Sequence, residues 1–232
     1  MCCVAVPQKS AEQISPEQFA TNLAGDAPVC WLSGPGEPLA HPSVGKFTRA
    51  FQDAGRTVFL ETDGTLLRRR IHEFRPDARL YLTVRLYGMR DSHDRRMERD
   101  GAFALAMEGI RAAQLSGFLI CARISVDGET SLEDVKHLLE HLRKAHVDGV
   151  VITSANRGAA AAEELQKKVT EARNLLGNAW WTAFSRLAER TLHPAPQHVF
   201  AETPHLAPET SRNAELNPVQ DGAGISEEVA VQ

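Results

Sequence analysis

The sequence has few cysteines, no long apolar run and no excess of positive charge. No apolar stretch approaches the roughly 20 residues that a membrane-spanning helix needs, and the first residues lack the basic and apolar regions of a secretory signal. Lys and Arg number 26 against 30 Asp and Glu, a net charge of −4, whereas a general nucleic-acid binder needs cations to neutralise phosphates. These absences predict a cytoplasmic protein with no membrane span and no nucleic-acid partner.

The four cysteines are Cys2, Cys3, Cys30 and Cys121. Cys30 and Cys121 lie in apolar, strand-like runs, which is typical of reduced and buried thiols. The adjacent pair Cys2-Cys3 is unsuited to a mutual disulfide, because that bond would strain the peptide between the two residues. Two interpretations of the pair stay open, a lipidation site and the remnant of a metal-binding loop.

Apolar runs alternate with amphipathic stretches through residues 15–192, which we expect to form the folded core. Strands are predicted at 29–32, 57–61, 80–86, 117–124 and 149–153. With helical stretches between them, this alternation predicts βαβ units and a parallel sheet. A βα barrel and an open doubly wound sheet are both compatible with it. In either architecture the ligand site belongs at the C-terminal ends of the strands.

The chain after the predicted core changes in composition. Residues 193–232 are rich in Pro, Glu, Ser, Asn and Gly and contain few large apolar side chains. Such a segment cannot bury enough apolar surface to offset the entropy lost on ordering. We therefore expect a disordered tail at 193–232.

Two turns at predicted strand ends could carry chemistry. The stretch Ser33–Pro38 follows the first predicted strand; its glycines let the backbone approach a ligand closely, and its amides could hold an anion. Glu37 in this stretch offers an acceptor suited to an ammonium group. The stretch Glu61–Gly64 ends the next strand with small polar groups that could hydrogen-bond a sugar. A tight strand–helix turn and a simple Asp-Gly turn are the structural alternatives.

Other polar groups are weaker candidates. His93 and Asp94 follow the third predicted strand and could act in acid–base or metal chemistry, although a structural role is the simpler interpretation. His137 and His141 have a spacing that can bind a metal, but we interpret them as surface residues. The run Arg68–Arg70 is interpreted as a solvated helix face.

Taken in order, these turns resemble the motifs of the radical S-adenosylmethionine (radical SAM) superfamily. The family's G-G-E-P, L-x-H-P, T-N-G, S-L-D-G, H-D and G-x-F motifs are similar, in that order, to Gly34–Pro38, Leu39–Pro42, Thr62–Gly64, Arg85–Gly88, His93-Asp94 and Gly101–Phe103. The hopanoid-associated radical SAM proteins are the group that the chain resembles most.

The resemblance implies a partial βα barrel, a 4Fe-4S cluster, and reductive cleavage of S-adenosylmethionine to a deoxyadenosyl radical. It implies a small-molecule substrate of hopanoid or isoprenoid type. It also implies cofactor contacts at Gly34, Gly36, Glu37, Pro38, Thr62 and Asp63.

The sequence departs from this family at the cluster. The family's C-x-x-x-C-x-x-C loop follows a first strand and supplies the three thiolates that such a cluster needs. We expect the first strand to be missing, residues 1–14 to be a remnant of the cluster-loop region, and Cys2 and Cys3 to be the remaining candidate metal ligands. Pro35, Asp63 and Tyr87 also replace family residues. Two hypotheses follow, a truncated or degenerate radical SAM enzyme and a cluster-free pseudoenzyme that binds a small molecule or a partner.

Overall fold

The computed structural model describes residues 2–5, 15–18, 20, 27–34, 36–155 and 163–192. The predicted tail at 193–232 and the greater part of the predicted N-terminal remnant lie outside the described residues. Both assignments therefore stay predictions.

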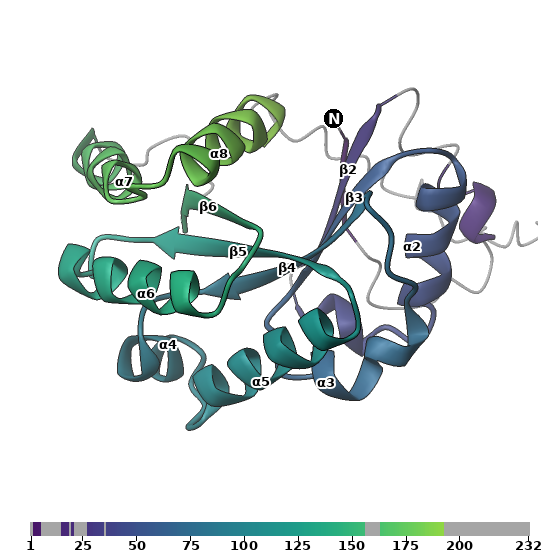
Figure 1. The fold of residues 1–232 in the computed structure, drawn as a ribbon, viewed down its shortest axis with the longest axis horizontal. Coiled ribbons are helices and arrows are strands. Elements are labelled where there is room, and N and C mark those ends of the chain that lie inside the picture. Colours follow the sequence, from purple (N-terminus) through teal and green to yellow (C-terminus); the bar gives the residue numbers. More distant parts are fainter. Residues whose placement is uncertain are drawn as a thin grey trace, which may run out of the picture. The chain divides into compact units, whose positions relative to one another are not determined.

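Within the described part of the chain, six parallel strands form one sheet in chain order (Figure 1). They are β1 Cys2–Ala5, β2 Val29–Ser33, β3 Thr57–Thr62, β4 Leu80–Leu86, β5 Leu119–Val126 and β6 Gly149–Ser154. A doubly wound sheet reverses its strand order part-way, and this sheet does not. The predicted α/β partial barrel is therefore confirmed, with five strands where the apolar runs placed them.

The prediction of a missing first strand is wrong. Residues 2–5 form β1, which pairs in parallel with β2 and sets Cys2 beside Cys30 and Cys3 beside Trp31. A run of four residues is too short for periodicity to separate a strand from a loop. The vicinal cysteines therefore belong to a strand, and not to the loop that follows one.

The helical elements alternate with the strands. They are η2 Pro38–Ala40, α2 Val44–Asp53, α3 Leu67–Arg70, η3 Ile71–Glu73, α4 Arg90–Arg96, α5 Ala102–Leu115, α6 Leu132–Lys144, α7 Glu163–Asn174 and α8 Ala179–Leu192. Ser131 caps α6, since its side chain accepts from the Asp134 N–H at 3.4 Å. None of the described helices has the length and apolarity needed to cross a membrane.

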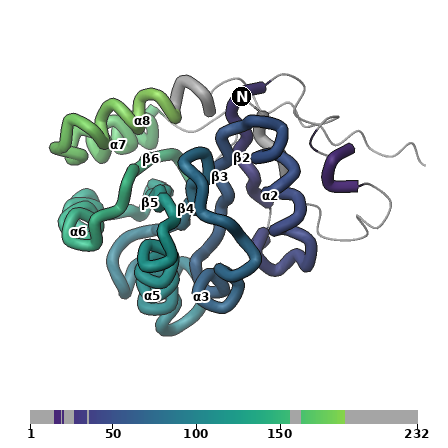
Figure 2. Tube along the Cα trace, turned by 45° about the vertical axis from the view of Figure 1, so that its right-hand side comes forward, coloured from purple at the N-terminus to yellow at the C-terminus, as the bar shows by residue number. Residues whose placement is uncertain are grey.

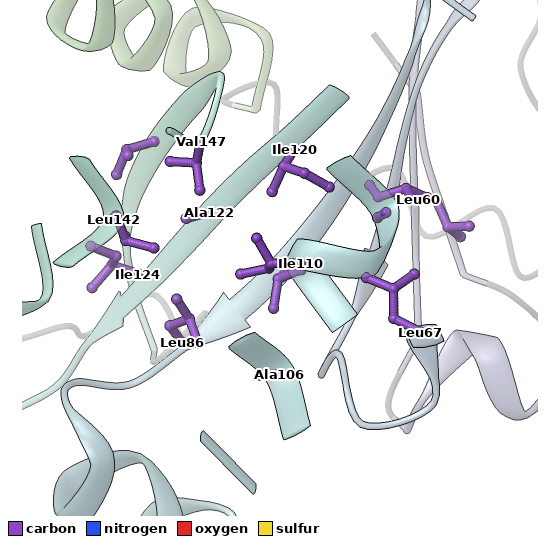
Figure 3. Packing of buried hydrophobic residues seen from close by; sticks show 14 of the residues in the cluster. Leu60, Leu67, Leu86, Ala106, Ile110, Ile120, Ala122, Ile124, Leu142 and Val147 are labelled. Atoms are coloured by element: carbon purple, nitrogen blue, oxygen red, sulfur yellow. The ribbon is translucent and has the colours of Figure 1, made fainter. Parts of the chain in front are cut away.

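The main core lies between the sheet and helices α2, α5, α6 and α7. Successive strand residues point to opposite faces, so alternate apolar residues such as Leu60, Ile120 and Ala122 face these helices. Figure 3 shows them packed with Ile110 of α5 and Leu142 of α6. Burying this face fixes the register of each strand, because a shift by one residue would expose the whole apolar set.

The opposite face of the sheet, here called the inner face, carries a second and smaller core near the strand N-termini. Trp31 stacks on Phe59 with ring centroids 4.9 Å apart, and Phe59 stacks on Tyr81 at 4.8 Å. Phe184 of α8 packs against Phe59 and Tyr81, and α8 lies across the sheet from α5 and α6 (Figure 2). A Cβ added at Gly149 would lie 2.4 Å from the Phe184 ring, so this glycine makes room for the helix.

Replacing Phe184 with Ala should remove the contact that seats α8 on the inner face. Phe184 is 8% exposed, and deleting a buried phenyl ring costs about 3 kcal/mol or more of the free energy of unfolding. Denaturant unfolding measures this loss. Leu115→Ala is the control, since Leu115 is 82% exposed and its truncation should change stability by less than about 0.5 kcal/mol. Equal stabilities of the two variants would contradict the packing of α8.

Candidate functional site

The turn after β2 is fastened to the end of β3 by the carboxylate of Glu37. Its Oε1 accepts hydrogen bonds from Thr62 Oγ1 at 2.7 Å and from the Leu39 N–H at 2.9 Å. Its Oε2 accepts one from the Asp63 N–H at 2.6 Å. Three of the predicted site residues, Glu37, Thr62 and Asp63, are therefore brought together at the C-terminal edge of the sheet.

The other predicted residues of this turn lie beside Glu37. Pro38 is the buried first residue of η2, for which Glu37 is the N-cap. Gly34 and Gly36 are half-buried, and the carbonyl of Gly36 accepts a hydrogen bond from Arg85. The turn thus lies at the predicted place and is stabilised by hydrogen bonds from the chain itself.

Burial raises the pKa of Glu37 to about 7, and the charge of the neighbouring Asp63 adds to the rise. The hydrogen bonds from the Asp63 N–H, Thr62 and the Leu39 N–H act in the opposite direction. Asp63 itself closes the turn, because its Oδ1 accepts from the Thr65 N–H at 2.8 Å and the Thr65 hydroxyl at 2.7 Å. Asp63 therefore has a structural role, whatever it binds.

An ionic cluster occupies the inner face between the aromatic layer and the edge turn. Glu61, 2% exposed, accepts a close hydrogen bond from Arg123 and one of 3.0 Å from Trp31 Nε1. Arg85 Nε lies 3.6 Å from Glu61 Oε1, and Arg123 Nε donates to Thr153 Oγ1 at 3.1 Å. Each charge has a counter-charge in reach, which is what burial of charged groups requires.

Sequence analysis missed this cluster. A signal was present, since Glu61, Arg85 and Arg123 are charged residues within three otherwise apolar strands. Their positions put all three side chains on the face that carries Trp31, and burying a charge is costly unless it is paired. Counting charges by sheet face, and not only in turns, would have indicated a polar inner face.

Arg70 stabilises the turn from the side of η2. Its guanidinium donates to the carbonyls of Leu39 and His41, the latter at 3.0 Å, and it pairs with Glu73. The interpretation of Arg68–Arg70 as a solvated face is therefore wrong for Arg70, whose side chain is 18% exposed. It is correct for Arg68, which is 70% exposed.

Asp94 of the His93-Asp94 pair has a structural role. Asp94 accepts hydrogen bonds from the Gly101 N–H at 2.8 Å and the Phe103 N–H at 2.7 Å, and so caps the start of α5. His93 is fully buried, and burial lowers its pKa. His137 lies at the surface, 3.3 Å from Glu133.

The described residues do not fit a metal cluster. They contain no group of three or more His, Cys, Asp or Glu side chains that could hold a metal ion. Cys30 and Cys121 are fully buried in the two cores on opposite faces of the sheet, and burial raises the pKa of the Cys121 thiol. The segment that follows β1, residues 6–14, contains no cysteine. The prediction for Cys2 and Cys3 as metal ligands concerns side chains outside the described part and stays a prediction.

Comparison with known proteins identifies distant relatives. No protein-family profile matches the sequence. The chain is 24% identical over 142 residues to a Fe-coproporphyrin III synthase of Methanosarcina barkeri, covering 60% of this chain and 35% of the relative. It is 34% identical over 115 residues to an AdoMet-dependent heme synthase of the same organism, covering 49% of this chain and 32% of the relative.

These two similarities support a distant relationship of the chain to the radical SAM superfamily.

The match spans about a third of the length of each of these two relatives. In fold, this chain is similar to archaeal TYW1, with a TM-score of 0.50, 15% identity and coverage of 75% of this chain and 71% of that one. It is also similar to Streptococcus suis SuiB, with a TM-score of 0.51, 10% identity and coverage of 65% and 37%. The distant sequence relatives support the predicted superfamily, and the fold matches agree with the predicted fold, while the hopanoid-associated subgroup stays a prediction.

Replacing Arg70 with Ala should loosen the turn that follows Glu37. Hydrogen bonds to a charged group contribute about 1.5–3 kcal/mol each, and the Leu39 and His41 carbonyls would each lose the bond from the guanidinium. We expect a loss of at least about 2 kcal/mol in the free energy of unfolding, measured in denaturant. The exposed neighbour Arg69 gives the matched control, since Arg69→Ala should leave stability nearly unchanged. Equal losses of stability in the two variants would contradict the role of Arg70 in holding this turn.

Replacing Glu37 with Gln should change the pH dependence of stability. The pKa of Glu37 is about 7 in the folded chain against a reference of 4.5, so between these values the folded state holds a proton that the unfolded state releases. Stability from this group is full below pH 4.5 and falls, by up to about 3 kcal/mol, as pH rises to 7. The free energy of unfolding of wild type should exceed that of Glu37→Gln near pH 4.5. This difference should shrink as the pH rises to 7. Glu108→Gln, at an exposed carboxylate, should keep the wild-type slope.

Proposed function

We propose that this chain is a cluster-free member of the radical SAM superfamily that binds a small molecule at the C-terminal edge of its sheet. One observation carries the proposal: β1 lies beside β2 as a first strand, and the segment that follows it has no cysteine. The motif that would hold the cluster is therefore missing from within the chain.

The cysteines elsewhere in the chain support the same proposal. A cluster with one open iron site needs three thiolates that converge. Cys30 and Cys121 are buried on opposite faces of the sheet, so these two thiols cannot converge on one cluster. Two vicinal cysteines are too few. The competing hypothesis, an enzyme that performs radical chemistry on S-adenosylmethionine with its own cluster, would need ligands that this sequence does not supply.

The edge of the sheet is where a ligand would bind. In parallel α/β sheets the ligands bind outside the C-terminal ends of the strands, and Gly36, Glu37 and Thr62 meet at that edge. The names of the two Methanosarcina relatives refer to coproporphyrin and heme, so an iron tetrapyrrole precursor is the first ligand class to test. A hopanoid or isoprenoid-type ligand follows from the sequence resemblance and is the second.

Anaerobic reconstitution with iron and sulfide tests the proposal directly. We expect the purified chain to bind iron only below stoichiometry, with the same visible absorbance and iron content as a Cys2→Ala/Cys3→Ala variant. Equal values would mean that the vicinal cysteines ligate nothing specific. A stoichiometric 4Fe-4S cluster that the double variant loses would overturn the proposal in favour of a radical SAM enzyme.

A further inference from the structure

The acceptors in the turn after β2 that suit a cation are already occupied by a side chain of the same protein. Arg85 of β4 donates from Nη2 to the Gly36 carbonyl at 3.0 Å. The same Nη2 lies 3.7 Å from Glu37 Oε2. A carbonyl and a carboxylate that converge in this way are the partners an ammonium group would take, since it has donors and no acceptor.

The Glu37 carboxylate already accepts hydrogen bonds from its own turn and from the end of β3. A carboxylate offers about four acceptor positions, and three are filled by Thr62 Oγ1, the Leu39 N–H and the Asp63 N–H. Arg85 Nη2 lies 3.7 Å from Oε2, the oxygen with one position left. An external cation that approaches this oxygen would therefore meet the guanidinium.

Burial and a second carboxylate hold Arg85 in this place. Its side chain is 18% exposed and that of Glu37 is 12% exposed, so water competes weakly with the pair. On the inner side, Arg85 Nε lies 3.6 Å from Glu61 Oε1. A planar guanidinium bridging two carboxylates is better pre-organised for this role than a flexible ammonium.

We propose that Arg85 is a specificity-determining residue, a built-in cation that closes this position to ligands carrying a free ammonium group. The inference rests on the proposed function, because it concerns the ligand bound at the same edge of the sheet. An ammonium entering there would have to displace the guanidinium and then lie beside it, and a juxtaposed like charge is an effective means of rejecting a ligand. The ligand class that remains is neutral or anionic at this end.

Calorimetric titration of the iron-free chain with two probes tests the proposal. S-adenosylmethionine carries an amino-acid ammonium, and methylthioadenosine has the same nucleoside without it. At pH 8, where Glu37 is ionised, Arg85→Ser should bind S-adenosylmethionine at least about tenfold more tightly than wild type, equivalent to about 1.4 kcal/mol. Arg85→Lys, which keeps a cation, should behave as wild type. Any affinity for methylthioadenosine should change less than about twofold across the three proteins, because that probe makes no demand on Glu37.

Two outcomes would overturn the proposal. One is a wild-type affinity for S-adenosylmethionine equal to that of Arg85→Ser, and the other is a folded Arg85→Ser that gains nothing. The wild-type titration stands by itself if Arg85→Ser does not fold, since tight binding of S-adenosylmethionine by wild type already refutes a blocked position. Because no iron is added, failure here is separate from failure of the cluster-free proposal, which iron reconstitution decides.

Discussion

The buried carboxylate of Glu61 is the point at which the aromatic and polar halves of the inner face meet. It accepts from Trp31 Nε1 on one side and pairs with Arg123 and Arg85 on the other. Removing one member of a buried ion pair leaves an uncompensated charge, which costs about 3–5 kcal/mol, although the intact pair adds little net stability. The cluster therefore fixes where its members lie more than it stabilises the fold.

Arg85 connects the ionic cluster around Glu61 to the edge of the sheet. Because its guanidinium also bonds the Gly36 carbonyl and faces Glu37, the turn after β2 and the inner face are connected through one side chain. Glu37 in turn fastens the end of β3, and Arg70 holds the chain just beyond it. Three charged side chains, Arg85, Glu37 and Arg70, thus hold the predicted binding turn in place.

Sequence reasoning found the features that depend on neighbours along the chain. The apolar runs of β2 to β6 and the turns at Glu37 and Asp63 each carry a local pattern that points to one structure. The edge strand β1 was too short for such a pattern. Two other features depend on how strands and helices pack. They are the hydrogen bond from Arg70 to the Leu39 carbonyl and the ionic cluster of Glu61, Arg85 and Arg123. No local rule states that packing, and only the cost of burying an unpaired charge hints at it.

The fold and the cluster chemistry of a radical SAM protein depend on different residues. The partial barrel is specified by the alternation of apolar residues and by strand order, and both survive the loss of a few polar residues. Cluster chemistry, in contrast, depends on three converging thiolates, and the segment after β1 contains no cysteine. A cation at the position of Arg85 can alter the ligand site just as simply, because the guanidinium satisfies the same acceptors and leaves the backbone of the turn unchanged. A chain can therefore keep the superfamily's strands and turns while the chemistry at their edge is replaced.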